Sequence, residues 1–360
     1  MREKQMNRRA FLKLAALGMG GLAFRSLDRS LYLPEFPAHD RLGRVVAGKV
    51  EVKARPNIDS ETVGVLFDDA VVPWLSSTVG PRPMWYSQRW VETPDGYIYA
   101  PNLQPVRNLP NVAISALPQS AAKPGMWVEV TVPYADLILA NPPARSPWLK
   151  EATQPRVYYS QILWVDEIKT DAQGQIWYRV NERYGTYGDI FWVEGEALRP
   201  LTADEMSPIS PNVEEKKVVV DVTYQTMACY EGSREVFFTR ISSGAKFDAQ
   251  GNAVDKWSTP VGPHHIWRKL VSVHMSGGTT GGGYDLPGIG WTTLFSGDGV
   301  AIHSTFWHNN FGVPMSHGCV NARPDDAKWV FRWTNPVTPA DTGDMTVSGS
   351  VGTVIQVVES

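Results

Sequence analysis

The sequence predicts a mostly β protein built from several small modules. Three observations favour this fold class: fourteen Trp, thirty-one Gly with twenty-seven Pro, and many short segments that alternate apolar and polar residues. Alternation is typical of strands, and Gly and Pro mark the turns between them. The 360 residues, 43% of them hydrophobic, suffice for two or three domains. A net charge of −3, with no basic run beyond the N-terminus, argues against nucleic-acid binding.

Residues 1–30 are predicted to be an export signal. The segment Asn7–Lys13, Asn-Arg-Arg-Ala-Phe-Leu-Lys, precedes a short apolar stretch that ends at Phe24, which is the twin-arginine pattern. The stretch is too short and too rich in Gly to span a bilayer comfortably. We expect the twin-arginine export machinery to carry the protein across the cytoplasmic membrane, to the cell wall or periplasm. No clear cleavage site follows Ala23, so tethering by an uncleaved segment stays open.

Residues 31–110 are predicted to form a small β barrel. Pro94-Asp95-Gly96 is a strong turn. Period-two alternation and β-forming residues predict strands at Gly48–Lys53, Thr62–Phe67, Ala70–Trp74, Trp85–Val91 and Tyr97–Ala100. This pattern resembles the bacterial Src-homology-3-type domains that commonly accompany cell-wall enzymes.

Residues 111–202 are predicted to form a second β module, with strands at Ile162–Val165, Ile176–Val180 and Phe191–Val193. The end of this module, Ala197–Leu201, is similar to Leu103–Val106, which indicates a weak internal repeat. The stretch Ala140–Gln154 fits no regular pattern. The aromatic residues of the two modules either fill small cores or bind glycan or stem peptide. The modules could equally be spacers.

A linker is predicted at 203–215, where Ser207-Pro208-Ile209-Ser210-Pro211 interrupts the pattern. The last domain, 216–360, opens with a strand at Lys217–Val222 and a hairpin. A short helix is predicted at Arg323–Arg332, stopped by Asn335-Pro336, and a last strand at Thr353–Val358. The Gly-rich stretch Ser276–Tyr284 lacks the Lys-Ser/Thr ending of a phosphate loop, so a flap or cleft loop is the better interpretation.

The segment between Ile302 and Asn321 gathers groups suited to thiol chemistry. Cys319 follows Gly318, and His303 lies at the end of an apolar run. A free Cys is mostly protonated near neutral pH, and a neighbouring imidazole can generate the reactive thiolate. We therefore predict Cys319 as nucleophile and His303 as base. The backbone N–H groups around Gly318 and Cys319 are predicted to stabilise the oxyanion. Ser304, Ser316 and His317 are predicted to supply the hydrogen bonds that orient His303.

These residues carry a family resemblance. His303-Ser304-Thr305 followed by Ser316-His317-Gly318-Cys319-Val320-Asn321 resembles the motif of the L,D-transpeptidase (YkuD-like) catalytic domain, which cross-links bacterial peptidoglycan. The hairpin and Ser258–Gly262 fit the same family. The resemblance implies a mostly β, sandwich-like domain in which Cys319 is acylated and His303 moves the proton. Ser304 stands where Gly is frequent, and Asn321 where Arg is frequent.

The resemblance implies two-step acyl transfer without a metal or organic cofactor. Cys319 would attack the bond between an L-centre and D-Ala in a stem tetrapeptide, release D-Ala and pass the acyl group to a side-chain amine of another stem. Carbapenem-type β-lactams are expected to acylate Cys319. Two alternatives stay open: an L,D-carboxypeptidase that uses water as acceptor, and a non-catalytic cell-wall protein that binds glycan or peptide through its β modules.

Several side chains near the motif are candidates for the wall of the substrate cleft or for the core: Tyr284, Trp291, Phe306, Trp307 and His308. Zinc is a competing interpretation, because three His and one Cys are good ligands. The ligand spacing lacks the short pairs of a structural site and no H-E-x-x-H helix is present, so no metal is predicted. A disulfide between Cys229 and Cys319 would remove the nucleophile, so Cys229 is expected to be a buried strand residue.

Overall fold

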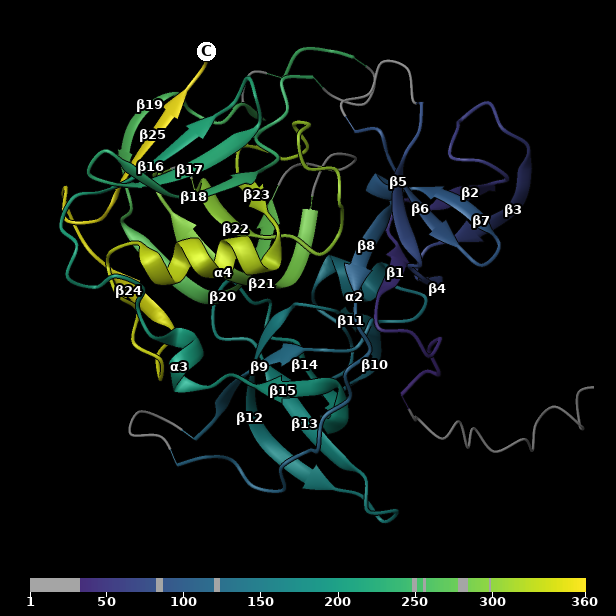
Figure 1. Cartoon of the computed structure of the whole chain (residues 1–360). Coiled ribbons are helices and arrows are strands. Elements are labelled where there is room, and N and C mark those ends of the chain that lie inside the picture. Colours follow the sequence, from purple (N-terminus) through teal and green to yellow (C-terminus); the bar gives the residue numbers. More distant parts are fainter. Residues whose placement is uncertain are drawn as a thin grey trace, which may run out of the picture. The chain divides into compact units, whose positions relative to one another are not determined.

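The computed structural model describes residues 33–81, 87–119, 124–247, 251–254, 257–277, 284–297 and 299–360, all within the unit Leu33–Ser360. The predicted twin-arginine segment, part of the predicted strand Trp85–Val91 and the centre of the Gly-rich stretch lie outside the described residues. In the described part of the chain, no helix is long and apolar enough to cross a membrane. As predicted, the structure is mostly β (Figure 1).

The first module contains two sheets and a small core. One sheet has the strand order β4-β1-β8 and the other β3-β2-β7-β6-β5. Val45, Trp74, Ile98 and Leu103 are buried in its core. A 3-10 turn, η1 (Ala100–Asn102), leads into the last strand. The strands are β1 (Leu42–Val45), β2 (Lys49–Lys53), β3 (Thr62–Phe67), β4 (Val71–Pro73), β5 (Ser76–Val79), β6 (Arg89–Thr93), β7 (Gly96–Tyr99) and β8 (Leu103–Val106).

The second module is organised around a seven-stranded sheet of order β11-β10-β14-β13-β12-β9-β15. It ends, like the first, with a 3-10 turn, η2 (Gly195–Ala197), that leads into a strand. A short helix, α2 (Pro147–Glu151), occupies the stretch for which the sequence showed no regular pattern. The strands are β9 (Met126–Val130), β10 (Tyr134–Leu139), β11 (Arg156–Tyr158), β12 (Ile162–Thr170), β13 (Ile176–Asn181), β14 (Ile190–Glu194) and β15 (Leu198–Pro200).

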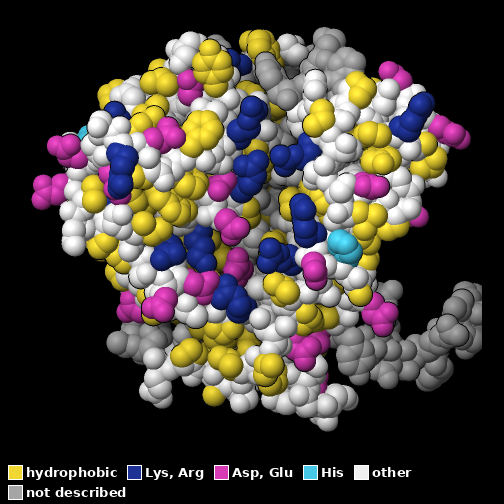
Figure 2. Space-filling model, in the orientation of Figure 1, with side chains coloured by type: hydrophobic (Ala, Val, Ile, Leu, Met, Phe, Trp, Pro, Cys, Tyr) yellow, Lys and Arg dark blue, Asp and Glu magenta, His cyan; other side chains and the backbone are white. Residues whose placement is uncertain are grey.

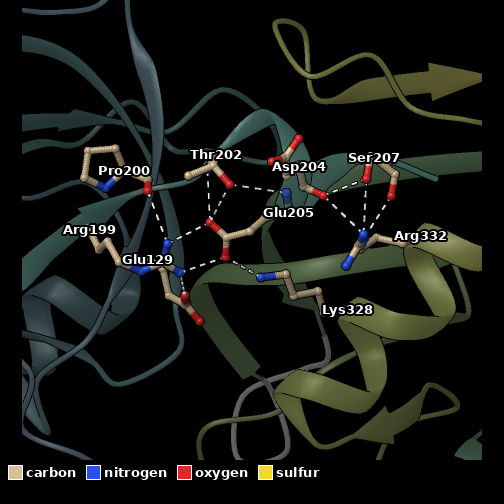
Figure 3. A network of polar contacts seen from close by, with 9 residues as sticks. All are labelled: Glu129, Arg199, Pro200, Thr202, Asp204, Glu205, Ser207, Lys328 and Arg332. Carbon is tan, nitrogen blue, oxygen red and sulfur yellow. Dashed lines mark hydrogen bonds and ion pairs between the residues drawn. The ribbon is translucent and has the colours of Figure 1, made fainter. Parts of the chain in front are cut away.

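The segment between the second module and the last domain, where the linker 203–215 is predicted, forms polar contacts with its surroundings. Thr202 and Glu205 form a capping box that starts helix α3 (Ala203–Met206). The Glu205 carboxylate also accepts hydrogen bonds from Arg199 and from Lys328, at 2.7 Å each, as Figure 3 shows. The prolines and charges of this segment predict that the strand pattern ends here. They do not predict that Glu205 would pair with Arg199 and Lys328.

The last domain has two five-stranded sheets, of orders β18-β17-β16-β25-β19 and β23-β22-β21-β20-β24. Two pairs are parallel: β16 with β25, and β22 with β23. Their buried faces share a core that includes Val218, Trp291, Ile302 and Ile355. The strands are β16 (Lys216–Asp221), β17 (Thr226–Glu231), β18 (Arg234–Arg240), β19 (Gly262–His265), β20 (Arg268–Gly277), β21 (Tyr284–Leu294), β22 (Ala301–Ser304), β23 (Val320–Ala322), β24 (Asp344–Thr346) and β25 (Val354–Val358).

Helix α4 (Pro324–Trp333) follows β23 directly, close to the predicted bounds. Pro lies in its first turn with two Asp residues, and Arg332 lies in its last turn, as the helix dipole favours. The buried ammonium group of Lys269 donates hydrogen bonds to the carbonyls of Phe331 and Thr334 at the end of the helix. The C-terminal end of α4 is therefore fixed by a buried side chain, and its N-terminal end directly follows β23, the strand after the proposed nucleophile.

Candidate active site

The parallel pair β22 and β23 brings the two halves of the motif together. In its register Ile302 lies opposite Val320, and His303 lies opposite Asn321. Cys319 directly precedes β23. The side chains of His303 and Cys319 consequently line the same cavity, which has a volume of about 320 Å³.

His303 is buried and oriented by a main-chain oxygen. Its Nδ1 lies 2.9 Å from the carbonyl oxygen of Ser304. A carbonyl can only accept, so Nδ1 carries the hydrogen and Nε2 is left as the acceptor. Burial lowers the pKa of His303 to about 4, and the imidazole is therefore neutral at pH 7, as a general base requires. The Ser304 hydroxyl is engaged elsewhere, since it accepts the N–H of Gly290 at 3.1 Å.

Cys319 is partly exposed, yet its thiol has few polar neighbours. The Sγ atom lies 3.9 Å from the carbonyl oxygen of Gly299. Burial raises the pKa of Cys319 to about 11, while a hydrogen bond from the backbone at Ala301 acts in the opposite direction. Burial thus favours a neutral thiol and a neutral imidazole in the free protein, and the thiolate would form only as His303 takes the thiol proton.

The loop before the thiol is fixed by its own polar groups. The Ser316 hydroxyl donates to the carbonyl oxygen of Cys319 and accepts the N–H of Gly318 at 3.2 Å. The N–H of Gly318 is thus already engaged in the free protein, and the backbone around Gly318 and Cys319 stays a predicted source of oxyanion donors. Gly318 has a φ of +120°, a conformation that favours Gly. Sequence reasoning assigned no role to Thr259, yet its hydroxyl donates to the Gly318 carbonyl oxygen at 2.8 Å.

His317 lies in the cavity wall. Its ring centroid is 4.3 Å from that of Trp257 and 5.4 Å from that of Tyr284. Among the described residues its buried Nε2 has no hydrogen-bond partner. His317 contacts aromatic rings. The group that orients His303 is the Ser304 carbonyl, and not His317 as predicted.

Asn321 and His308 support the motif from a buried position. The main chain of Asn321 pairs with Ser242 through hydrogen bonds of 2.8 and 3.0 Å. The side-chain amide of Asn321 lies 2.8 Å from His308 Nε2. Burial and the neighbouring His303 lower the pKa of His308 to about 3. His308 is therefore a neutral, buried residue that supports the loop, and it does not line the cavity that contains Cys319.

The candidate cleft residues divide into two groups. Tyr284 and Trp307 line the cavity, together with three residues that the sequence did not single out: Met275, Leu286 and Met315. Trp291 and Phe306 do not line it, so of the two predicted alternatives, cleft wall or core, they take the core. Trp291 is 1% exposed and packs on Phe331 in the core, and Phe306 stacks on Tyr158 of the second module.

The remaining predictions concern metals and the second thiol. No group of three or more His, Cys, Asp or Glu side chains in the described ranges is placed to hold a metal ion. Cys229 is buried in β17, where burial raises its pKa. Neither Cys229 nor Cys319 is in a disulfide.

Comparison with known proteins identifies the part of the chain that carries this site. Residues 215–355 match the family model described as L,D-transpeptidase catalytic domain, YkuD. No curated protein sequence matches the chain.

Three solved structures illustrate the likeness. The L,D-transpeptidase C442S mutant of Enterococcus faecium is 24% identical, with 41% of this chain and 51% of that chain covered and a TM-score of 0.31. The L,D-transpeptidase from Mycobacterium smegmatis is 22% identical, with coverages of 53% and 81% and a TM-score of 0.31. LdtMt1 in complex with imipenem is 21% identical, with coverages of 53% and 82% and a TM-score of 0.31. The chain spans about half the length of the Enterococcus protein. By the family match, residues 215–355 belong to the YkuD family of L,D-transpeptidase catalytic domains.

Proposed function

We propose that this protein is a cysteine-dependent L,D-transpeptidase that cross-links peptidoglycan stem peptides. The observation that carries the proposal is the shared cavity of Cys319 and His303, in which the Ser304 carbonyl fixes the imidazole so that Nε2 is the acceptor. The family match of residues 215–355 supports the same reaction class.

In the proposed acylation step, Cys319 attacks the carbonyl carbon between the L-centre of the third stem residue and D-Ala. As the carbon–sulfur bond forms, the thiol proton moves to Nε2 of His303. Collapse of the tetrahedral intermediate breaks the carbon–nitrogen bond, and the imidazolium gives its proton to the amine of the departing D-Ala. The neutral starting pair fits this proton shuttle, because no charge has to be held in the buried site before substrate binds.

In the proposed transfer step, a side-chain amine of a second stem attacks the thioester. His303 takes a proton from the amine, and the carbon–sulfur bond breaks as the proton returns to the thiol. The product is a cross-link between two third-position residues. The apolar side chains of Met275, Leu286, Trp307 and Met315 around the thiol favour this outcome over hydrolysis, since an occupied apolar cavity excludes water.

The oxyanion of the intermediate needs a donor, and the N–H of Gly318 is already engaged. Beside the backbone of Cys319, Tyr284 is a further candidate. Its phenol lines the cavity, and burial together with the neighbouring Cys319 raises its pKa. A phenol that stays protonated is a suitable hydrogen-bond donor to a developing negative charge.

Product analysis tests the proposal. The purified protein is incubated with disaccharide-tetrapeptide, and the products are separated and weighed. A transpeptidase yields cross-linked dimers and free D-Ala, whereas a carboxypeptidase yields disaccharide-tripeptide and free D-Ala. Release of no D-Ala would contradict both and favour the cell-wall-binding alternative. We also propose export by the twin-arginine pathway, and acylation of Cys319 by carbapenem-type β-lactams.

A further inference from the structure

A second cavity, of about 520 Å³, lies away from Cys319 and is lined by residues of both β modules and of the last domain. Arg41 and Arg107 come from the first module, Tyr159 and Ser160 from the second, and Thr305 from the segment after β22. In Figure 2, Lys and Arg side chains gather over the region between α4, β8 and β15, where the surface is hollowed. Nothing in the proposed transpeptidase reaction uses this cavity.

Two buried hydroxyl groups of this cavity lack hydrogen-bond partners. Ser160 is 3% exposed and Thr305 is 2% exposed. Neither Ser160 Oγ nor Thr305 Oγ1 has a hydrogen-bond partner among the described residues. Buried hydroxyls without partners are uncommon, because their desolvation is then uncompensated. Next to them, burial raises the pKa of the Tyr159 phenol to about 12, so this group remains a donor at neutral pH. The hydroxyl-lined part of the cavity therefore offers several unused hydrogen bonds.

Charged residues of both signs line the cavity: Asp325 and Asp326 come from α4, where Asp326 lies 3.5 Å from Arg323, and Arg41 and Arg107 come from the first module. The guanidinium of Arg199 donates to Glu129 at 2.6 Å and to Glu205 at 2.7 Å, and Lys328 also contacts Glu205 (Figure 3). These cations are neutralised by the protein itself. Arg41 and Arg107 are exposed, and neither forms an ion pair within the part of the chain that the structure describes. A guanidinium without a carboxylate partner is well suited to bind a carboxylate or phosphate with two parallel hydrogen bonds.

We propose that this second cavity binds a carboxylate-bearing segment of peptidoglycan, with Arg41 and Arg107 contacting the carboxylate and the hydroxyls of Tyr159, Ser160 and Thr305 contacting amide or sugar groups. This inference rests on the proposed function, because only a protein that acts on the cell wall meets this ligand at high local concentration. The cavity would hold a part of the polymer that is not undergoing reaction.

The cavity has a structural connection to the first one. Thr305 and His308 both line the second cavity and follow His303 in the chain. His308 also contacts the side-chain amide of Asn321, which lines the cavity of Cys319. A ligand in the second cavity therefore contacts the segment that carries the proposed base.

Calorimetric titration of the full chain tests the site. The Cys319→Ala variant is titrated with disaccharide-tripeptide, which lacks the D-Ala leaving group and so cannot be a donor. The matched ligands are the same tripeptide with its carboxylates amidated, and inorganic phosphate. The protein variants are Arg41→Gln with Arg107→Gln, Thr305→Val, and the exposed control Arg55→Gln, which lies outside the cavity.

We expect the tripeptide to bind, and the double Arg variant to weaken binding at least tenfold. Thr305→Val should weaken it several-fold and Arg55→Gln should leave it unchanged. Amidation of the ligand's carboxylates should weaken binding to the unsubstituted cavity as much as the double Arg substitution weakens binding of the tripeptide. Equal binding of the amidated ligand, or unchanged binding by the double Arg variant, overturns the proposal. Binding of phosphate without binding of the tripeptide also overturns the proposal, because the cavity would then bind an anion that does not come from peptidoglycan.

The titration separates this proposal from the transpeptidase reaction. It uses a variant without the thiol, so an inactive wild type would leave the binding result unaffected. Conversely, acyl transfer by wild-type protein together with no binding at the second cavity would remove this inference alone.

Discussion

The hydroxyl of Thr259 donates a hydrogen bond of 2.8 Å to the carbonyl oxygen of Gly318, the residue immediately before Cys319. The same hydroxyl accepts the N–H of Gly244 at 2.9 Å. Thr259 is 4% exposed, so both bonds are buried. The conformation of the loop that presents the thiol is thus fixed by a residue 59 positions before Gly318 in the chain.

Replacement of Thr259 by Val keeps the shape of the side chain and removes both hydrogen bonds. The buried carbonyl of Gly318 and N–H of Gly244 then lose their partner, which should cost about 1–3 kcal/mol of the free energy of unfolding. Denaturant unfolding measures this loss, and acylation of Cys319 should slow in parallel. Thr259→Ser, which keeps the hydroxyl, should retain most of the wild-type stability and most of the wild-type acylation rate. Wild-type stability and acylation in Thr259→Val would contradict the role assigned to this residue.

The protonation states of Cys319 and His303 predict the pH dependence of thiol reactivity. With a thiol pKa of about 11 and an imidazole pKa of about 4, little thiolate exists near pH 7. The rate of alkylation by iodoacetamide should therefore rise about tenfold per pH unit between pH 7 and 10. Mass spectrometry follows the label, and Cys319→Ala corrects for any labelling of Cys229. A rate that is already level at pH 7 would indicate a thiolate–imidazolium pair and contradict the neutral pair.

A buried charged triad predicts pH-dependent stability. The ring nitrogens of His274 lie 2.7 Å from Glu182 and 2.6 Å from Asp285. Burial lowers the pKa of His274, but the hydrogen bonds and charges of Glu182 and Asp285 outweigh it, so the pKa is raised. The stabilisation is then complete below the unfolded-state pKa of about 6.5 and is lost as the pH rises through the higher folded-state value.

His274→Gln should therefore destabilise the protein most at acidic pH, by about 3–5 kcal/mol, because it leaves the buried carboxylates without their charged partner. Urea unfolding of wild type and variant at several pH values between 5.5 and 9 measures the difference, which should shrink as the pH rises. A difference in the free energy of unfolding that stays constant across this pH range would show that the charge of His274 does not contribute to stability.

Tyr284→Phe tests the proposed oxyanion donor. The ring and its packing are kept and only the phenol oxygen is lost, so substrate binding should change little. Loss of one oxyanion donor typically lowers the rate about 100-fold, and we expect a fall in kcat of that order with KM nearly unchanged. The exposed Tyr224→Phe is the matched control. An unchanged kcat would require another donor.

Part of the fold could be predicted from the sequence because the signals are local. Helix α4 has Pro and acids at its start and a stop at Asn335-Pro336, and its observed bounds differ from the prediction by one residue at each end. The β17–β18 hairpin is likewise specified by alternation around a short turn. Strand β5 (Ser76–Val79) was missed, since its sequence is mostly polar and it is defined by pairing with β6.

The site was harder to predict, because its contacts join distant segments. Trp291 and Tyr284 lie in the same strand, one in the core and the other on the cavity, and alternation alone does not tell which face of β21 meets the core. The stacking of Phe306 on Tyr158 joins two modules. The engagement of the Gly318 N–H by Ser316 depends on a loop conformation that no periodicity encodes. The catalytic roles of Cys319 and His303 stay predictions.

The most direct test of the central claim is the intact mass of the protein after incubation with disaccharide-tetrapeptide, with Cys319→Ala alongside. Acyl chemistry at Cys319 predicts that the wild type gains the mass of the donor minus D-Ala and that the variant gains nothing. Peptide mapping should place the added mass on Cys319. A folded wild-type protein that gains no mass, or a Cys319→Ala variant that gains the same mass, would contradict the account.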